Sequence, residues 1–303
     1  MITNMMCHFS LKTLTRARTG GNAAYFVLVT SEEDLKRAVG FCQNRNLPHY
    51  VLGEGSNVLA SDHDFSGVVI KLGGRLTSIQ ISSADSEVKA GAGAPLMKLG
   101  FGLAHQGFTG YEYMAVIPGT VGGAVRINAG TTKYGEIKEH FLSARVLEPG
   151  RLEIVGYTCK DMRFGHRESA ISNSRAIVVE ARFRLLSQER LNMQSAMRNV
   201  RALLGLRRRR HPKNPRTFGS TFKNPPSGKA AGWYLEQVGM KGLWVGDAMV
   251  AEEHANWILN LGKAKSRDVK ELIETGQRRV FEEFGVRLER EVVFLPEDME
   301  NWQ

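Results

Sequence analysis

A glycine-rich stretch at residues 117–130, which reads IPGTVGGAVRINAG, limits the folds open to this chain. Glycine lacks a Cβ, so it allows positive φ and lets a ligand approach the main-chain amides, and Pro118 fixes φ on entry. The stretch is poor material for the interior of a helix or strand. It fits either a tight structural turn or a cradle for a pyrophosphate or flavin. We favour the cradle, because Thr120 and Asn128 add polar groups among its four glycines.

A second loop, Gly53–Asn57, lies between two short β-prone segments at residues 50–52 and 58–60. The dinucleotide fingerprint Gly-x-Gly-x-x-Gly requires a third glycine and a following helix, but Val58 holds that place and no helical pattern follows. The loop is still suited to phosphate, which its amides, Ser56 and Asn57 would surround as an anion nest.

Hydrophobic periodicity predicts an α+β first lobe. One helix begins at Ser31, which with Asp34 resembles a capping box, and another has Pro95 as its first residue and Gly107 as a left-handed cap. The β-prone segments lie at residues 25–29, 67–72, 87–90 and 177–185, with a hairpin at 144–155.

A change in composition precedes the second lobe. Residues 188–210 are polar, basic and helical in character, so we place a domain boundary near residue 200. Beyond it we expect a helix at 231–238, a final helix and a strand at 291–295. The final helix is expected to have Ser266 as its cap, Gly285 as its end, and a buried stripe of Val269, Leu272, Ile273, Val280 and Phe284.

Composition argues against several classes of protein. The three cysteines are widely spaced without a Cys-x-x-Cys, and the histidines lack ligand-like spacing, so neither disulfides nor a metal site is indicated. No apolar run is long enough to cross a bilayer, and no signal peptide is visible. We therefore expect a cytoplasmic protein that binds no membrane.

The formal net charge of +10 raises the question of a polyanionic partner. The densest basic run is Arg207–Arg210, but no RNA-binding motif, zinc-finger spacing or zipper accompanies it. A solvated helix end would explain the run, and a small anionic substrate would also favour a basic cleft. Charge alone does not separate a nucleotide sugar from a nucleic acid.

Three separated stretches resemble, in order and spacing, the UDP-N-acetylenolpyruvoylglucosamine reductases of peptidoglycan synthesis. They are residues 52–59 (LGEGSNVL), 117–130 and 219–225 (GSTFKNP). Residues 254–257 (HANW) and 288–292 (LEREV) are similar to the closing motifs of that family, so the resemblance covers residues 15 to 295. The short C-terminal lobe is similar to the compact, type II branch, which lacks a substrate-covering insertion.

This resemblance implies an α+β fold with an FAD-binding N-terminal region at residues 1–200 and a smaller α+β substrate-binding domain at 201–303. The first region would comprise two α/β subdomains of the PCMH/VAO flavin type, at about 1–75 and 76–200. FAD would be bound, NADPH would donate hydride, and the substrate would be a nucleotide sugar; we expect a monomer that binds no nucleic acid. The residues matched to the FAD diphosphate and ring are Gly53, Gly55, Ser56, Asn57, Gly119, Thr120, Gly122 and Gly123.

The implied reaction reduces the enolpyruvyl ether of UDP-N-acetylglucosamine to the lactyl ether of UDP-N-acetylmuramate. It needs a hydride donor, a group that stabilises an enolate, and an acid. By the resemblance, Arg167 and Glu291 match the charge-stabilising pair and Ser220 the proton donor. Asn224 and Lys223 match a substrate-diphosphate position and its neighbour. Taken singly, Arg167 would fit a surface ion pair and Ser220 a turn hydroxyl. Asn224 would fit a turn cap and Lys223 a solvated side chain.

Two positions depart from the family pattern. His166 stands at a substrate-binding position where a tyrosine usually precedes the arginine, and because imidazole changes charge near neutral pH we expect activity to be more sensitive to pH. Residues 131–133 (TTK) form an insertion beside the expected flavin contacts. Two other functions stay open: a flavin oxidoreductase of the same fold with a different substrate, and a non-catalytic basic binding protein.

Overall fold

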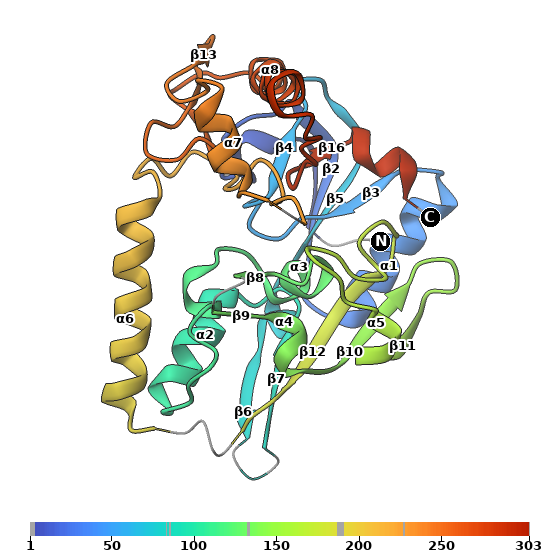
Figure 1. The fold of residues 1–303 in the computed structure, drawn as a ribbon. Coiled ribbons are helices and arrows are strands. Elements are labelled where there is room, and N and C mark those ends of the chain that lie inside the picture. The colour runs from blue at the N-terminus through green and yellow to red at the C-terminus, as the bar shows by residue number, and fades with distance from the viewer. Residues whose placement is uncertain are drawn as a thin grey trace.

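The computed structural model describes residues 4–82, 84, 86–131, 134–186, 191–226 and 228–302. Figure 1 shows one sheet and the C-terminal lobe in the upper half of the molecule and a second, larger sheet in the lower half, with helix α6 (Met193–Arg210) along the left side. None of the helices within these residues is long and apolar enough to span a membrane.

The first sheet has the strand order β1-β2-β5-β3. Strand β2 pairs antiparallel with β1 and parallel with β5, which also pairs parallel with β3. Asp34 N donates to Ser31 Oγ at 3.1 Å, which confirms Ser31 as the cap of helix α1, whereas the Asp34 carboxylate accepts from Thr30 and does not complete a capping box. The bounds are β1 (Met5–Ser10), η1 (Leu11–Thr13), β2 (Asn22–Val29), α1 (Glu32–Asn44), β3 (His49–Val51), β4 (Val58–Ala60), β5 (Phe65–Leu72) and η2 (Gly74–Thr77).

The second sheet is fully antiparallel in the order β11-β10-β12-β7-β6. It contains the predicted hairpin and the predicted strand before residue 185. The bounds are β6 (Ile79–Ser82), β7 (Glu87–Gly91), α2 (Leu96–His105), η3 (Met114–Val116), α3 (Val121–Arg126), β8 (Gly130–Thr131), β9 (Gly135–Glu136), α4 (Ile137–His140), β10 (Phe141–Glu148), β11 (Glu153–Thr158), α5 (Cys159–Met162), β12 (Ile177–Arg184) and α6 (Met193–Arg210).

In the C-terminal lobe, helices α7 and α8 pack on a small antiparallel sheet. They also share a hydrophobic cluster with Leu59 of β4. The bounds are α7 (Ala231–Gln237), β13 (Trp244–Val245), β14 (Ala248–Val250), β15 (Ile258–Asn260), α8 (Ser266–Phe284), β16 (Val293–Leu295) and η5 (Glu297–Asn301). Residue 200 lies within α6, where Ala196 and Val200 pack on Ala104 and Ala115 of the first lobe. The domain division near that residue stays a prediction.

Three local expectations were wrong. Pro95 is the N-cap of α2 rather than its first residue, because its backbone is extended (ψ 126°) and bridges to Thr120. Ser266 lies inside α8, and its hydroxyl donates to Asp62 Oδ2 at 2.9 Å instead of capping the helix. Phe284 is 37% exposed, whereas the other four residues of the expected stripe are buried.

The glycine-rich stretch contains a short helix, α3, although its composition predicted that it would form neither a helix nor a strand interior. Thr120 caps it, accepting from Gly123 N at 3.4 Å. A Cβ on Gly122 would lie 2.8 Å from Ala92 Cβ, so glycine lets α3 approach the end of β7 closely. Tight packing therefore selects glycine here, and only Gly119, with φ 136°, has a left-handed backbone within 117–126.

The end of the chain returns to the first glycine loop. Strand β16 pairs parallel with β4, directly after that loop, and Val293 N donates to Asn57 O at 3.1 Å. The predicted strand begins two residues late, because the amide of Glu291 donates instead to Thr221 O at 2.9 Å. Glu291 is thereby held between the 219–225 segment and the loop Gly53–Asn57.

Candidate active site

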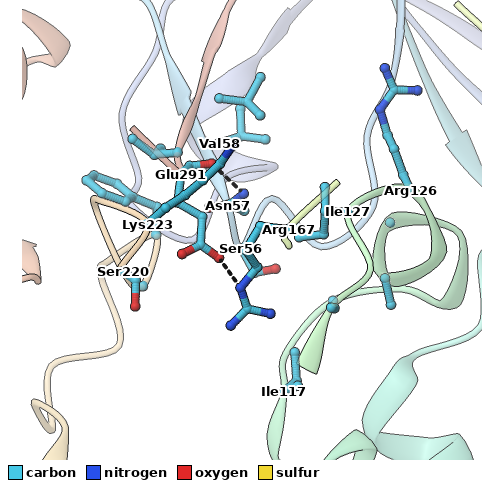
Figure 2. Close-up of a pocket in the computed structure, with 18 of the residues that line it drawn as sticks. Ser56, Asn57, Val58, Ile117, Arg126, Ile127, Arg167, Ser220, Lys223 and Glu291 are labelled. Atoms are coloured by element: carbon cyan, nitrogen blue, oxygen red, sulfur yellow. Dashed lines mark hydrogen bonds and ion pairs between the residues drawn. The ribbon is translucent and has the colours of Figure 1, made fainter. Parts of the chain in front are cut away.

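A cavity of about 1070 Å³ lies where the two glycine segments meet the C-terminal lobe (Figure 2). An adjoining cavity of about 460 Å³ shares the wall formed by residues 50–54. Gly122 lines only the adjoining cavity, and His166 is exposed and outside both linings. The remaining expected site residues line the larger cavity: Gly53, Gly55, Ser56, Asn57, Gly119, Thr120, Gly123, Arg167, Ser220, Lys223, Asn224 and Glu291.

The two glycine segments are joined directly. Ser56 Oγ donates to Pro118 O at 3.0 Å, and Gly119 N donates to Glu54 Oε2 at 3.1 Å. A Cβ on Gly53 would lie 2.7 Å from Thr120 Oγ1. Close approach of the segments thus explains glycine at position 53 and makes them one continuous wall.

The loop Gly53–Asn57 has unused donors. Within the part of the chain that the structure describes, the backbone amides of these five residues donate no hydrogen bond, although all five residues line the cavity. Consecutive free amides form a concavity for anions. The loop therefore has the donors that a diphosphate site requires, and its role in cofactor binding stays a prediction.

Arg167 and Glu291 form an ion pair at the cavity wall, with Nε and Oε1 3.2 Å apart (Figure 2). Arg167 has a left-handed backbone (φ 57°) in a turn closed by Gly165 N donating to Glu168 O. Buried Asn128, from the glycine-rich stretch, donates to Gly165 O at 2.8 Å. The stretch therefore orients the turn that carries Arg167.

The carboxyl of Glu291 has a pKa shifted by this environment. Its side chain is only 16% exposed, and burial raises its pKa, which the charges of Arg167, His166 and Lys223 partly oppose. Asn57 Nδ2 donates to the backbone carbonyl of Glu291 at 3.0 Å. The backbone of Glu291 is thus fixed beside the loop, and its carboxyl lies against Arg167 with a raised pKa.

Ser220 lies on the facing segment, which Asn256 holds in place. Asn256 Oδ1 accepts from Phe222 N at 2.9 Å, its Nδ2 donates to Phe222 O at 2.8 Å, and the Ser220 backbone bridges to Trp257. Figure 2 shows Ser220 facing the space beside the Arg167–Glu291 pair. Among the described residues, nothing hydrogen-bonds the Ser220 hydroxyl, so it is available to a ligand.

The two neighbouring polar residues have partners within the protein. Lys223 Nζ lies 2.5 Å from Glu289 Oε1, and Asn224 Oδ1 accepts from Ala231 N at 3.0 Å at the start of α7. Both side chains still belong to cavity-lining residues. Of the insertion, Thr131 accepts from Tyr134 N at 3.1 Å, whereas Thr132 and Lys133 lie outside the described residues. No group of His, Cys, Asp or Glu suited to a metal occurs in the part of the chain that is described.

Comparison with known proteins decides the family. Residues 23–152 match the FAD binding domain family, and residues 211–295 match the UDP-N-acetylenolpyruvoylglucosamine reductase C-terminal domain. UDP-N-acetylenolpyruvoylglucosamine reductase 2 of Symbiobacterium thermophilum is 39% identical over 284 residues, which cover 93% of this chain and 89% of that protein. The chain belongs to the UDP-N-acetylenolpyruvoylglucosamine reductase family. The predicted family is confirmed.

Other members of the reductase family agree over nearly the whole chain. The reductase of Lachnoclostridium phytofermentans is 35% identical, covering 96% of this chain and 93% of its own length. The crystal structure of the Thermus caldophilus reductase superposes with a TM-score of 0.80 at 35% identity, covering 97% of this chain and 98% of that one. The predicted α+β fold with an FAD-binding region is therefore confirmed.

Sequence reasoning missed several residues that line the cavities of this reductase family member. Arg126 and Trp302 line both cavities, and Arg207 lines the larger one with its guanidinium 5.8 Å from the Trp257 ring centre. The sequence leaves open whether the run that contains Arg207 is a solvated helix end or part of a basic cleft. The position of Arg207 at the C-terminus of α6, one turn before His211, gave no signal that it faces inward.

Gly55 provides a test of the cofactor loop in this reductase. Its φ is 59°, and a Cβ would lie 2.4 Å from Leu14 O, so Gly55→Ala is expected to lower the free energy of unfolding by about 2–4 kcal/mol. Gly150→Ala is the control, since nothing lies within 4 Å of its added Cβ. Urea denaturation measures both, and a Gly55→Ala protein as stable as wild type would contradict the packing described.

The raised pKa of Glu291 predicts how the free energy of unfolding of the reductase depends on pH. Because its folded-state pKa is raised above the ordinary value of 4.5, its contribution is fully present below 4.5 and is lost as pH rises through the folded pKa. Glu291→Gln is therefore expected to gain stability relative to wild type across that window, by about 1.4 kcal/mol per unit of the shift. Denaturation at a series of pH values measures the difference, and a flat difference would contradict the raised pKa.

Proposed function

We propose that this chain reduces UDP-N-acetylenolpyruvoylglucosamine to UDP-N-acetylmuramate, using bound FAD and NADPH as the hydride donor, in the synthesis of peptidoglycan precursors. The observation that supports the proposal is one cavity lined both by five residues whose backbone amides donate no hydrogen bond within the described chain and by the half-buried Arg167–Glu291 pair. Membership of the reductase family supplies the substrate and the cofactor.

The residues present fit FAD. The amides of Gly53–Asn57 would hold its diphosphate, and the glycine-rich wall at Gly119 and Gly123 leaves space beside the ring. Bound FAD supplies the hydride after accepting it from NADPH. We infer that the FAD-binding region comprises residues 1–200 and the substrate domain residues 201–303.

The polar residues of the cavity have separate proposed roles. The Arg167–Glu291 pair would stabilise the negative charge that develops on the substrate carboxylate as hydride adds to the terminal alkene carbon. The Ser220 hydroxyl would give its proton to the neighbouring carbon, which completes the addition across the double bond. Lys223 and Asn224 would meet the substrate diphosphate, and exposed His166 would reach substrate at the rim.

The basic run supports a small anionic substrate over a nucleic acid. Arg207 faces the cavity and Trp257, which leaves Arg208, Arg209 and Arg210 exposed at the end of one helix. The proposal includes a monomer in the cytoplasm, where NADPH is available, and no membrane or nucleic-acid partner.

A two-step spectroscopic experiment tests the function. The purified protein should be yellow, NADPH should bleach it under anaerobic conditions, and only the enolpyruvyl nucleotide sugar should restore the oxidised spectrum. Protein that takes up no FAD would refute the proposal and favour a binding protein. Bleaching without re-oxidation by this sugar would favour a flavin oxidoreductase with a different substrate.

A further inference from the structure

The C-terminal segment at residues 296–302 supplies Asp298 to the wall of the larger cavity and Trp302 to the walls of both. Helix η5 leads to Trp302, and the indole lines both the larger and the smaller cavity. We propose that this segment is a strap over the cofactor site and that Trp302 is its closing side chain, which slows the release of FAD. The proposal rests on the function proposed above.

Ion pairs attach the strap to the C-terminal lobe. Asp298 accepts from both terminal nitrogens of Arg290, at 2.9 and 3.2 Å, and also from Phe294 N at 2.8 Å. Glu297 Oε1 lies 2.5 Å from Lys270 Nζ on α8. The two-point contact between the Arg290 guanidinium and the Asp298 carboxylate fixes the orientation of these groups as well as their distance. The direction of the strap is therefore set before it reaches Trp302.

Trp302 then contacts both halves of the FAD-binding region. Its ring stacks on Tyr50 of β3 with centroids 5.5 Å apart and planes at 29°. The guanidinium of Arg126, at the end of α3, lies 4.4 Å from the centre of the same ring. One side chain thus bridges the first sheet and the glycine-rich segment, the two walls between which the cavities run.

Arg126 is held rigidly and lacks a counter-charge. Its guanidinium donates to Ser172 O and Ser174 O, each at 2.7 Å, and to Ala176 O at 3.3 Å. No carboxylate pairs with it among the described residues, and it lines both cavities. A half-buried cation paired only with carbonyls and an indole favours an anionic ligand beside it.

The two cavities share the lining residues 50–54, Thr120, Gly123, Arg126 and Trp302. A dinucleotide cofactor has a flavin half and an adenylate half, and a site of two joined cavities suits such a ligand. Trp302 lies at the junction, so a cofactor that occupied both would have to displace the strap in order to leave. Contacts of Trp302 with Tyr50 and Arg126 would oppose that displacement.

The rate of FAD release from the holoenzyme tests the strap. Trp302→Ala is expected to release FAD about tenfold faster than wild type and to raise its Kd similarly, whereas Trp302→Phe, which keeps a ring, stays within about threefold. Asp298→Asn loosens the strap with Trp302 intact and is expected to speed release about threefold. The rise in free-flavin fluorescence after dilution measures each rate.

Trp244→Ala is the matched control, because that indole is 68% exposed on β13 and lines neither cavity. Trp302→Ala protein that releases FAD at the wild-type rate, or binds it more tightly, would overturn the strap while the function stands. Wild-type protein that takes up no FAD would overturn the function and the strap together.

Discussion

Replacing Ser220 with alanine is expected to slow reduction of the nucleotide sugar by about 10²–10⁴-fold while NADPH reduces the flavin at the wild-type rate. The hydroxyl has no partner within the described residues, and the backbone of its segment is held by Asn256 and Trp257. Removing Oγ therefore takes away a proton donor without releasing the loop. Rapid-mixing absorbance measurements follow the two half-reactions separately.

Ser78→Ala serves as the control for this substitution, because Ser78 is exposed at the end of η2 and lines neither cavity. Its two half-reactions should both match wild type. An unchanged second half-reaction in Ser220→Ala would show that the proton comes from elsewhere in the cavity.

Arg167→Met is expected to produce the other large loss, about 10²–10³-fold in the second half-reaction. The guanidinium is 3.2 Å from Glu291 and lines the cavity, so its removal leaves the developing carboxylate charge without its cation. Arg167→Lys should recover part of the rate, because it keeps the charge but loses the planar fork. Steady-state kinetics with saturating NADPH measure both variants.

Arg163→Met is the matched control, since Arg163 also has a left-handed backbone (φ 42°) but is exposed and lines neither cavity. Loss of activity in both variants would point to backbone strain rather than charge. In the double variant with Glu291→Gln, the two losses should fall short of additive, because each residue acts through the same pair.

The sequence predicted elements whose signals are local. The Ser31 cap of α1, the β10–β11 hairpin and the left-handed glycines at 107 and 285 all depend on residues a few positions apart. Errors arose where a distant residue decided the outcome. Ser266 donates to Asp62 across 204 positions. The glycine-rich helix α3 packs closely on Ala92, where a Cβ on Gly122 would not fit.

The residues of the site could be predicted from the sequence where they belong to recognisable motifs. The loop Gly53–Asn57, Arg167, Ser220 and Glu291 line one cavity, although their chemical roles stay predictions. Trp302 belongs to no motif, and Arg126 lies within the 117–130 stretch without a local signal for its role, so neither was predicted to line the site. They meet only after α3 and the C-terminal segment have packed against β3.

The attachment of β16 to the first glycine loop has a consequence for synthesis of the protein. Asn57 bonds to the carbonyl of Glu291, a residue that the ribosome adds 234 positions later. At roughly 5–20 residues per second, the loop waits about 10–50 s for that partner. An incomplete nascent chain therefore lacks Glu291 and β4 lacks its neighbour, so the chain cannot assemble the cavity and turn over substrate until its C-terminal residues have left the ribosome.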